Sequence, residues 1–324
     1  MLVTGGAGYI GSHAAKALRA AGYRVTIYDN LSAGHRRAAL GAPLIEGDIR
    51  DVETVRRTLR DTGASAVMHF AAFLNVSESV AEPVAYYRNN VMGTLATLEA
   101  MAAESCRRFV FSSTCAVYGE PVETPIRETH PTAPINAYGQ TKLAIEHALP
   151  HYERGWGLRS IRLRYFNAAG ADPDGEIGED HHPEIHAIPR AIEAATGGPE
   201  FKIMGTDYPT PDGTCVRDYV HVADIARAHL AALDRIDEIG FDCFNVGSES
   251  GYSVLEVIRA TEAVIKRRVP HVVSRRRAGD PAVLVATSSK LGRTLNWRPQ
   301  QSALETIVAT AWEWRTRFPD GYAS

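Results

Sequence analysis

Short apolar runs alternate with amphipathic stretches along the first half of the chain. Residues 1–4 form an apolar run that ends in a glycine turn, and residues 10–21 then place apolar side chains at helical spacing. Further apolar runs of strand length cover residues 24–28, 44–46, 66–70, 108–112 and 158–165. Helices are predicted over residues 52–60, over residues 79–103 and from residue 136 onward. Strands that alternate with helices across short turns indicate an α/β fold with a doubly wound parallel sheet.

The helix over residues 79–103 is the longest that the pattern predicts. Its apolar side chains recur at helical spacing along one stripe, so we expect this stripe to be well buried. The stripe comprises Val80, Val84, Tyr87, Val91, Leu95 and Leu98.

The regular alternation stops after Asn167, where residues 171–213 form a polar, proline-rich stretch. Strand-like residues 216–222 and 242–246 then flank a helical run, and they are predicted to rejoin the first sheet. We therefore expect two domains, each built from two pieces of the chain. The pieces are residues 1–167 plus 214–247 for the larger domain, and residues 168–213 plus 248–324 for a smaller C-terminal α/β lobe.

Composition and charge exclude several classes of partner. The 324 residues include 35 basic and 38 acidic side chains, a net charge of −3, so no overall field attracts nucleic acid or an anionic membrane. No apolar run reaches the roughly 18 residues of a membrane-spanning helix, and Gly5 and Gly6 interrupt any secretory signal. The four cysteines form no CxxC pair, which is typical of the reducing cytoplasm. Neither a nucleic-acid partner nor a membrane partner is expected.

Glycines at the first strand-to-helix turn indicate a dinucleotide site. Residues 4–11 read Thr-Gly-Gly-Ala-Gly-Tyr-Ile-Gly, with Gly8 placed for close approach of a pyrophosphate and Gly11 for packing of the helix on the strand. The N-terminus of that helix offers N–H groups to phosphate. Asp29 ends the second strand 18 residues after Gly11, where a carboxylate binds the adenosine ribose and repels a 2′-phosphate. The pattern predicts NAD as the cofactor, with Asp48 and Ile49 next to its adenine.

Tyr138 and Lys142 form the candidate catalytic pair. Their spacing of four places both on one face of the predicted helix. A free tyrosine has a pKa of about 10, but a nearby ammonium and a nicotinamide cation both favour the phenolate. Thr114 supplies a hydroxyl at the end of an upstream strand, at the sheet edge where ligands bind. Together these side chains predict proton transfer in alcohol–ketone chemistry.

The glycine turn and the Tyr-x-x-x-Lys pair together resemble the extended short-chain dehydrogenase/reductase superfamily, which has a Rossmann-type sheet. The closer resemblance is to the UDP-galactose (UDP-glucose) 4-epimerases, and it covers nearly the whole chain. The matching segments are residues 3–12, 28–32, 46–50, 69–72, 111–114, 164–167, 212–219 and 276–280. Several of these segments are specific to nucleotide-sugar epimerases.

The resemblance implies an NAD-dependent isomerase that inverts C4 of a UDP-hexose through a 4-keto sugar, with NAD tightly bound. Tyr138 would act as base and acid at the sugar O4, Thr114 would hydrogen-bond O4, and Lys142 would bind the nicotinamide ribose. Hydride would pass from C4 to NAD⁺ and return to the other face of the ketose. The residues expected to contact NAD are Gly5, Gly8, Tyr9, Ile10, Gly11, Asp29, Asn30, Asp48, Ile49, Phe70, Ala71, Ala72, Asn90, Tyr138, Lys142 and Tyr165.

The same resemblance implies a UDP-sugar as the substrate, bound mainly by the smaller lobe. The residues expected to contact it are Thr114, Asn167, His186, Met204, Gly205, Arg217, Arg277, Asp280 and Leu284. Arg217 and Arg277 would bind the diphosphate through their forked guanidinium groups, and Asp280 would bind a ribose hydroxyl. The segment after Ala72 departs from the family pattern, because it holds Leu74 where many epimerases have a lysine nearby.

The sequence leaves the identity of the sugar open. UDP-xylose or UDP-arabinose and UDP-GlcNAc are alternatives to UDP-glucose and UDP-galactose. Leu284 matches the position beside the C2 substituent of the sugar, and its intermediate size predicts some turnover of UDP-GlcNAc. A 4,6-dehydratase is disfavoured, because Cys115 and Ala116 rather than an acid pair follow Thr114. A non-catalytic NAD-sensing regulator is a minor alternative, since such proteins usually lose the tyrosine–lysine pair.

Two further expectations concern metal binding and the oligomeric state. No metal is expected, because no third ligand has helical or hairpin spacing to the adjacent residues His181 and His182. Relatives pair two subunits through the helices that carry residues 91–101 and 138–149. The resemblance therefore implies an isologous homodimer.

Overall fold

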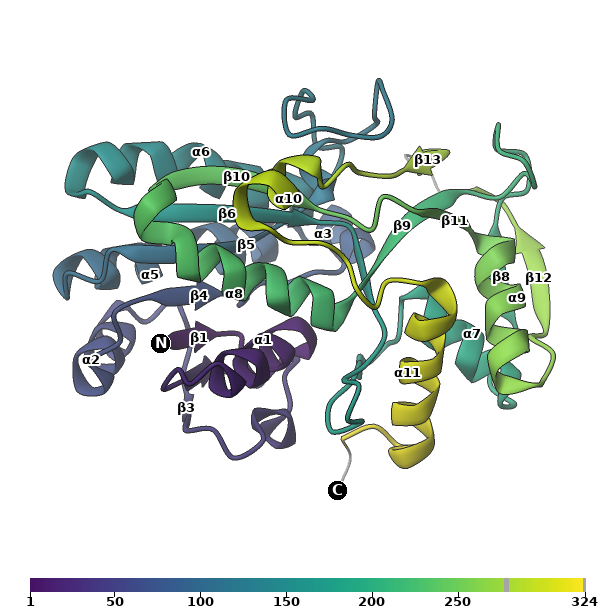
Figure 1. Ribbon diagram of the computed structural model, residues 1–324, viewed down its shortest axis with the longest axis horizontal. Helices are drawn as coiled ribbons and strands as arrows, with labels where there is room; N and C mark the ends of the chain where they lie inside the picture. The colour runs from purple at the N-terminus through teal and green to yellow at the C-terminus, as the bar shows by residue number, and fades with distance from the viewer. Residues whose placement is uncertain (277–279, 323–324) are drawn as a thin grey trace. The chain divides into compact units, whose positions relative to one another are not determined.

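The computed structural model describes residues 1–276 and 280–322, and the chain divides into two compact units (Figure 1). The first unit comprises Met1–Gly119, Pro131–Tyr165 and Ala226–Phe244. The second unit comprises Glu120–His130, Phe166–Ile225 and Asn245–Ser324. Each unit contains a hydrophobic cluster of its own.

A seven-stranded sheet forms the centre of the first unit. Its strand order is β10-β6-β5-β4-β1-β2-β3, and the pairs from β3 to β6 are parallel. The strands are β1 (Leu2–Thr4), β2 (Thr26–Asp29), β3 (Leu44–Glu46), β4 (Val67–His69), β5 (Arg108–Thr114), β6 (Arg159–Tyr165) and β10 (Phe241–Val246). The order reverses between β1 and β4, where doubly wound sheets bind ligands at the carboxyl ends of their strands. The predicted fold class is confirmed.

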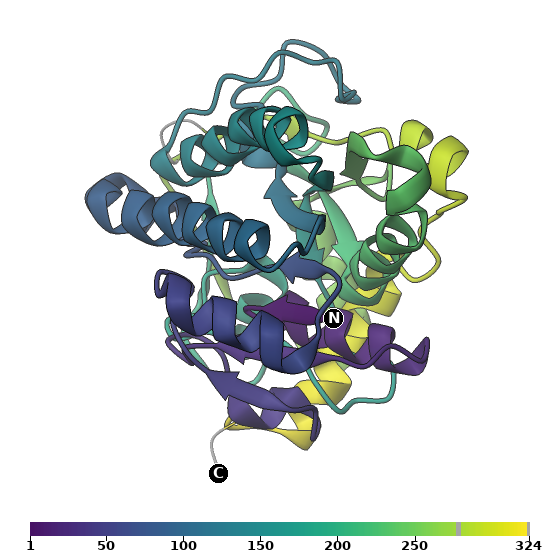
Figure 2. The same cartoon turned by 90° about the vertical axis from the view of Figure 1, so that its left-hand side faces the viewer.

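Helices cover both faces of this sheet (Figure 2). They are α1 (Tyr9–Ala20), α2 (Val52–Thr62), α5 (Gly93–Ala103), α6 (Ala137–Trp156) and α8 (Val222–Ile239). Helices α2, α5 and α6 pack on one face, where Leu2, Val67 and Phe109 belong to one hydrophobic cluster. Val3 and Met68 alternate with these residues, face the opposite side and are also fully buried. Burial on both faces explains why the strands read as continuous apolar runs.

The prediction of one buried helix over residues 79–103 is wrong in its first half. The structure has α3 (Val76–Ala81), α4 (Pro83–Tyr86), the π-helical stretch η2 (Tyr87–Met92) and then α5. Pro83 lacks an N–H group and follows the end of α3, and the π-helical turn changes which side chains face the core. Val80, Val84 and Tyr87 are therefore exposed, whereas Leu98 is fully buried as predicted.

Small sheets and several helices make up the second unit. Strand β9 (Val216–His221) pairs with β7 (Asn167–Ala169) and β13 (Val283–Leu284) in parallel and with β11 (Gly251–Ser253) in antiparallel orientation. Strand β8 (Phe201–Met204) pairs with β12 (His271–Ser274). The helices are α7 (Ala187–Ala195), α9 (Val254–Ile265), α10 (Ser289–Leu295) and α11 (Leu304–Arg317). Side chains of α7, α9 and α11 form the hydrophobic cluster of this unit.

The two units divide the chain at residues other than the predicted domain boundaries. Residues 242–246 join the seven-stranded sheet as part of β10, as predicted. Residues 216–222 are predicted to do the same, but β9 pairs with three strands of the second unit instead. Residues 120–130 also belong to the second unit, where Ile126 bridges to Ala286 and its carbonyl accepts a hydrogen bond from Asn245 Nδ2 at 3.1 Å.

The structure also bears on the expectations from composition. Within residues 1–276 and 280–322, no helix is both long enough and apolar enough to cross a membrane. None of the four cysteines, all of which lie within the described residues, forms a disulfide. Burial raises the pKa of the Cys106 thiol to about 11, so this side chain stays protonated at neutral pH and is a poor nucleophile.

Candidate active site

Two glycines in the turn between β1 and α1 are required by the fold itself. Gly5 has a φ of +69°, and a Cβ there would lie 2.4 Å from the backbone nitrogen of Ala71. A Cβ on Gly11 would lie 2.1 Å from the carbonyl oxygen of Gly5, so the helix approaches the turn too closely for any side chain. Both glycines therefore set the path of the backbone from the strand into the helix.

Gly8 differs, because the fold leaves room for a side chain at this position. It is the N-cap of α1 with a φ of −82°, and a Cβ added there would have the oxygen of Gly5 as its nearest neighbour, at 3.4 Å. Tyr9 and Ile10 begin the helix, and none of the described side chains caps it. The first N–H groups of α1 thus face an open cradle that a Cβ would narrow. This arrangement fits the pyrophosphate of a dinucleotide.

Asp29 at the end of β2 hydrogen-bonds the backbone of the glycine turn. Its Oδ2 accepts a hydrogen bond from the amide of Ala7 at 2.9 Å, and its Oδ1 accepts one from the amide of Leu31 at 2.9 Å. Burial raises the pKa of this carboxyl, and the two amide hydrogen bonds oppose the shift. The carboxylate is thus fixed at the strand end where an adenosine ribose is expected.

The residues predicted next to the adenine lie at the end of β3. Asp48 pairs with Arg50 at 2.6 Å, and the side-chain hydrogen bond from Arg50 holds the pKa of Asp48 below its usual value. Asn30 hydrogen-bonds the same carboxylate. Ile49 is 5% exposed and belongs to the hydrophobic cluster of the first unit. Its side chain therefore packs in the core of the first unit.

The segment after β4 runs beside the glycine turn. The amides of Phe70 and Ala71 donate to the carbonyl of Thr4 at 2.8 and 3.1 Å, which places Phe70, Ala71 and Ala72 next to the end of β1. Asn90 holds this segment from η2, accepting from the amide of Phe73 at 2.8 Å and donating to its carbonyl at 3.1 Å. The structure thus gives Asn90 a role in shaping the wall of the site.

Lys142 extends from α6 to the end of β5. Its Nζ donates to the carbonyl of Ser112 at 2.8 Å and lies 5.0 Å from the centre of the Phe111 ring. Burial lowers the pKa of Lys142 to about 7, and the carboxylate of Glu146 opposes the shift. A neighbouring negative charge therefore helps to keep this ammonium protonated at neutral pH.

Tyr138 and Thr114 meet at the same edge of the sheet. Burial raises the pKa of the Tyr138 phenol, the nearby Tyr165 raises it further, and a hydrogen bond with Thr114 lowers it. Tyr165 ends β6 and its hydroxyl contacts Ser112 Oγ. The structure thus brings Tyr138, Lys142, Thr114 and Tyr165 together at the carboxyl ends of β5 and β6.

A buried ion pair that the sequence analysis misses lies beneath these residues. Glu146 is four residues after Lys142 on α6, and its Oε1 accepts from Arg164 Nε at 2.9 Å and from Ser113 Oγ at 2.5 Å. Arg164 Nη1 also lies 3.0 Å from the hydroxyl of Tyr118. The sequence does contain a signal for Glu146: its spacing of four residues from Lys142 places both side chains on the same helix face.

Replacement of Glu146 by glutamine is expected to destabilise the fold by about 3–5 kcal/mol, because it leaves a buried guanidinium without a counter-charge. The exposed pair of Arg36 and Glu46, 2.6 Å apart, provides a control. Glu46→Gln should change the free energy of unfolding by less than about 1 kcal/mol. Urea unfolding of both variants measures the difference. Equal, small losses would contradict a stabilising role for the buried pair.

His69 is a second buried polar group at this edge of the sheet. Its Nδ1 lies 2.7 Å from Thr4 Oγ1 and its Nε2 lies 2.9 Å from Thr94 Oγ1. Burial lowers the pKa of His69 to about 3, and the positive charge of Lys142 lowers it further. The ring is therefore neutral in the folded protein throughout the physiological range.

Stability is expected to fall in mild acid because of His69. Below pH 6.5 the unfolded chain binds a proton at this residue, whereas the folded protein does so only near pH 3, so folding weakens as the pH falls between these values. From pH 7 to pH 5 the loss is about 2 kcal/mol. His69→Gln keeps the hydrogen-bonding capacity of the side chain. Between pH 7 and pH 5 its free energy of unfolding, measured in urea, should therefore fall by that much less than that of the unaltered protein. Identical pH dependences would show that His69 is not responsible.

In the second unit, several of the residues expected to contact UDP lie around Arg217 on β9. Its Nη2 lies 3.1 Å from Asp280 Oδ1, and its Nη1 donates to the carbonyl of Pro281 at 2.8 Å. Leu284 on β13 is the register partner of Arg217. Asn167 on β7 donates to the carbonyl of Asp218 in β9 at 3.2 Å. Arg277 lies outside the described residues.

The segment expected at the uracil follows β8. Gly205 has a φ of +95° and follows Met204 at the end of that strand. The guanidinium of Arg276 lies 3.9 Å from the centre of the Tyr208 ring. Burial raises the pKa of Tyr208, the charge of Asp280 raises it further and that of Arg217 lowers it, which places this segment close to the Arg217 group. The sequence analysis does not single out Tyr208, which the structure places beside these expected substrate contacts.

His186 lies apart from the Arg217 group in the sequence and is held by acidic neighbours. It is the N-cap of α7, and its Nδ1 lies 2.5 Å from Glu179 Oε1. The charge of Glu179 raises the pKa of His186 to about 10 against the effect of burial. The structure thus gives His186 a carboxylate partner within the protein.

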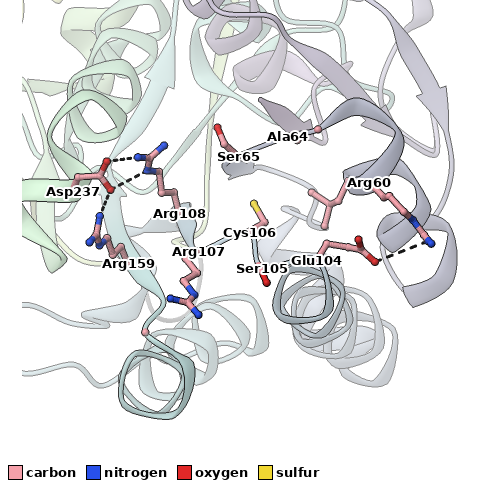
Figure 3. Close-up of a pocket in the computed structure, with 13 residues that line it drawn as sticks. Arg60, Ala64, Ser65, Glu104, Ser105, Cys106, Arg107, Arg108, Arg159 and Asp237 are labelled. Atoms are coloured by element: carbon pink, nitrogen blue, oxygen red, sulfur yellow. Dashed lines mark hydrogen bonds and ion pairs between the residues drawn. The ribbon is translucent and has the colours of Figure 1, made fainter.

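A hollow of about 620 Å³ opens at the other, amino-terminal edge of the seven-stranded sheet (Figure 3). Cys106, Arg108 and Arg159 line it, and both arginines are paired with Asp237. None of the residues predicted to bind NAD or substrate lines this hollow. The candidate site of the first unit therefore lies at the carboxyl edge.

A glycine turn with room for a pyrophosphate, beside a tyrosine and a lysine at the ends of parallel strands, defines a class of dinucleotide-dependent enzymes that act on hydroxyl and carbonyl groups. The family within this class follows from comparison with known proteins. Residues 1–247 match the NAD dependent epimerase/dehydratase family, and the chain belongs to it.

Similar proteins match along the full length of the chain. The UDP-glucose 4-epimerase of Rhizobium meliloti is 50% identical over 323 residues, which are 99% of this chain and 98% of the relative. The crystal structure of UDP-glucose 4-epimerase from Brucella ovis in complex with NAD is 47% identical, with a TM-score of 0.94 over 96% of both chains. The enzyme from Bifidobacterium longum in complex with NAD⁺ and UDP is 37% identical, with a TM-score of 0.94 over 99% of both chains.

Proposed function

We propose that this chain interconverts UDP-glucose and UDP-galactose by inverting C4 of the sugar. The grouping of Tyr138, Thr114 and Lys142 beside the glycine turn carries the proposal. NAD, when bound, supplies the oxidation at C4 and the later reduction of the ketone. The open cradle at Gly8 and the fixed carboxylate of Asp29 fit this cofactor. Because the reaction is redox-neutral overall, the cofactor has no need to leave between turnovers.

The phenol of Tyr138 would move the proton at the sugar O4. It removes this proton as C4 is oxidised and returns it as the ketone is reduced. Burial raises the pKa of the phenol, so proton removal at neutral pH requires positive charge nearby. Lys142 supplies that charge from the same helix face, and Glu146 helps to keep Lys142 protonated. Thr114 orients the phenol through its hydrogen bond.

The second unit would supply most of the contacts to UDP. Arg217 and Arg277 would bind the diphosphate, since guanidinium groups fit phosphate oxygens in a forked geometry. The residues assigned to the remaining contacts are Asn167 and His186 at the phosphates, Asp280 at the ribose, Met204 and Gly205 at the uracil, and Leu284 beside the sugar C2. In the structure Arg217 is paired with Asp280, so both side chains are held next to each other before a nucleotide arrives.

One assay tests the activity and the identity of the sugar. The purified full chain is incubated without added NAD, in separate samples, with UDP-galactose, UDP-GlcNAc and UDP-arabinose, and the C4 epimers are followed by NMR. We expect the hexose without an N-acetyl group to react fastest and UDP-GlcNAc to react slowly beside Leu284. No turnover of any sugar by protein that holds NAD would favour a non-catalytic NAD-sensing role. Faster turnover of UDP-arabinose would favour the pentose epimerase.

The chain is further proposed to work as a homodimer in the cytoplasm. Exposed apolar side chains lie on α3, α4, η2 and the segment before α6 in the first unit, as expected for a surface that a second copy covers. They are Val80, Val84, Tyr87, Met92 and Ile135. The four cysteines form no disulfide, which suits a reducing compartment. A monomeric mass in solution scattering would contradict the dimer.

A further inference from the structure

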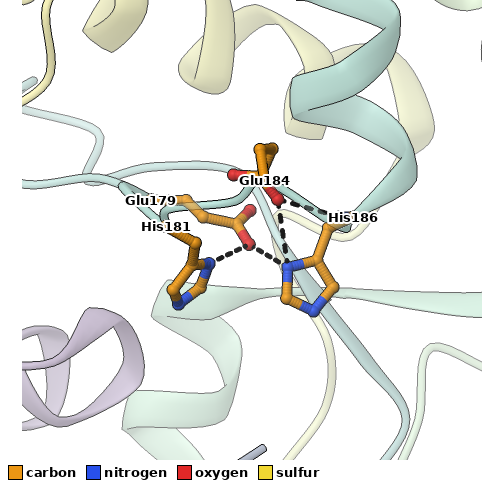
Figure 4. Close-up of side chains that lie close together, drawn as sticks. All are labelled: Glu179, His181, Glu184 and His186. Atoms are coloured by element: carbon orange, nitrogen blue, oxygen red, sulfur yellow. Dashed lines mark hydrogen bonds and ion pairs between the residues drawn. The ribbon is translucent and has the colours of Figure 1, made fainter. Parts of the chain in front are cut away.

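Four side chains that surround one point in the second unit have no part in the proposed epimerisation as a group. They come from the eight residues before α7: Glu179, His181, Glu184 and His186 (Figure 4). Each offers one nitrogen or carboxylate oxygen, and these four atoms all lie within 4.8 Å of one another. Glu179 stands in the middle, with its Oε1 2.5 Å from His186 Nδ1 and 3.2 Å from His181 Nδ1.

The distances suit a four-coordinate ion at the common point. Nitrogen and oxygen ligands of zinc lie about 2.0–2.1 Å from the metal, so neighbouring ligand atoms of a tetrahedral site are about 3.4 Å apart. The separation of 3.2 Å between Glu179 and His181 and that of 3.4 Å between Glu184 Oε1 and His186 Nδ1 match this edge. The separation of 2.5 Å between Glu179 and His186 would need to open by roughly 1 Å.

The surroundings of His186 Nδ1 also favour a metal ligand. This nitrogen is buried between two carboxylate oxygens, Glu179 Oε1 at 2.5 Å and Glu184 Oε1 at 3.4 Å, and neither oxygen is aligned with the ring N–H as in a regular hydrogen bond. An ion pair formed for stability alone would align the N–H bond with one of these oxygens. A nitrogen lone pair that points toward a metal needs no such alignment.

Charge and supporting contacts also favour a cation. Two carboxylates give the cluster a charge of −2 when both rings are neutral, which a divalent ion balances. The side chain of Glu179 is only 5% exposed, so its charge requires a partner. Glu184 Oε1 is held in place by the amides of Ile185 and His186, at 2.7 and 2.8 Å. Such outer hydrogen bonds orient the ligands in metal sites.

We propose that Glu179, His181, Glu184 and His186 bind one divalent first-row transition-metal ion, with Zn²⁺ as the best fit to two imidazoles and two carboxylates. Four protein donors leave no open position, so the ion is structural and fixes the turn that leads into α7. Its presence would tie His186, an expected phosphate contact, to the three other ligands.

Zinc titration of the full chain with its NAD tests the proposal. After treatment with a chelator, the protein is titrated with Zn²⁺ in a calorimeter, and tightly bound zinc is counted by mass spectrometry. We expect one ion per chain. Glu179→Gln and His181→Gln should each weaken binding by more than about 100-fold, because even outer-shell partners contribute 10- to 100-fold. Circular dichroism verifies that each variant is folded.

His182→Gln is the matched control. His182 is the next residue in the chain, its side chain is 79% exposed, and it lies 3.2 Å from Asp180 rather than in the cluster. This variant should bind zinc like the unaltered protein. Equal losses in the two histidine variants, or no stoichiometric binding at all, would overturn the proposal and leave an ion-pair cluster.

Cobalt provides a readout that does not depend on variants. Co²⁺ bound at the four donors should give the intense visible absorption of a tetrahedral complex, whereas a pale octahedral spectrum would contradict the site. None of these measurements requires turnover. Failure of the metal site would therefore leave the proposed epimerase activity untouched.

Discussion

Replacement of Tyr138 by phenylalanine is expected to lower the rate of epimerisation about 10²- to 10⁴-fold, the usual contribution of a general acid–base group. The variant keeps the aromatic ring and removes only the hydroxyl, which hydrogen-bonds with Thr114. UDP binding should be unchanged, because the residues proposed to hold UDP belong to the second unit. Initial rates by NMR and calorimetric titration with UDP separate the two effects.

Tyr152→Phe is the matched control on the same helix. Its ring lies edge-on to Trp156, 6.4 Å away, near the far end of α6. This variant should epimerise at the full rate. The content of bound NAD is measured in every sample, since a fall in rate that follows loss of NAD would assign Tyr138 to cofactor binding. An unchanged rate in Tyr138→Phe with NAD present would remove the phenol from the reaction.

The sequence predicts the sheet of the first unit well because its strands are buried on both faces and therefore read as apolar runs. It fails over residues 79–103 for a local reason. A stripe drawn at a period of 3.6 residues assumes one uninterrupted helix, but Pro83 separates α3 from α4 and η2 is π-helical. The change of phase exposes Val80 and Val84 and buries Tyr86 and Asn90 instead.

The candidate site is predictable where it depends on local spacing. The glycine turn and the Tyr-x-x-x-Lys pair each lie within a few residues, and Glu146 is detectable by the same spacing. The partner of Glu146 is not, because Arg164 reaches it from β6 through the packing of the sheet. The four residues proposed to bind a metal before α7 follow an irregular turn, so no helical or strand period connects Glu179 with His186.

Strand pairing across long intervals is the part that the sequence could not supply. Residues 216–222 have the composition of another strand of the first sheet, and nothing local distinguishes β9 from β10. The two strands differ in their neighbours: β9 pairs with β7 and β13, whereas β10 pairs with β6. This choice decides that Arg217 lies next to Asp280.

Gly8→Ala is expected to leave the stability of the NAD-free chain within about 1 kcal/mol of the original while weakening NAD binding about 30- to 150-fold. The backbone at Gly8 has a φ of −82°, which alanine adopts freely, and the added methyl group meets the nearest atom at 3.4 Å. A bound pyrophosphate would occupy that same space, and overpacking costs about 2–3 kcal/mol. Urea unfolding and calorimetric titration with NAD measure the two quantities.

Gly11→Ala separates the demands of the fold from those of the cofactor. Its methyl group would lie 2.1 Å from the oxygen of Gly5, so this variant should lose stability even without NAD. The pair of variants thus distinguishes a glycine kept for the ligand from one kept for the backbone. If Gly8→Ala bound NAD as tightly as the unaltered chain, the pyrophosphate could not lie against this turn. If both variants unfolded alike, Gly8 would serve the fold and would carry no information about the cofactor.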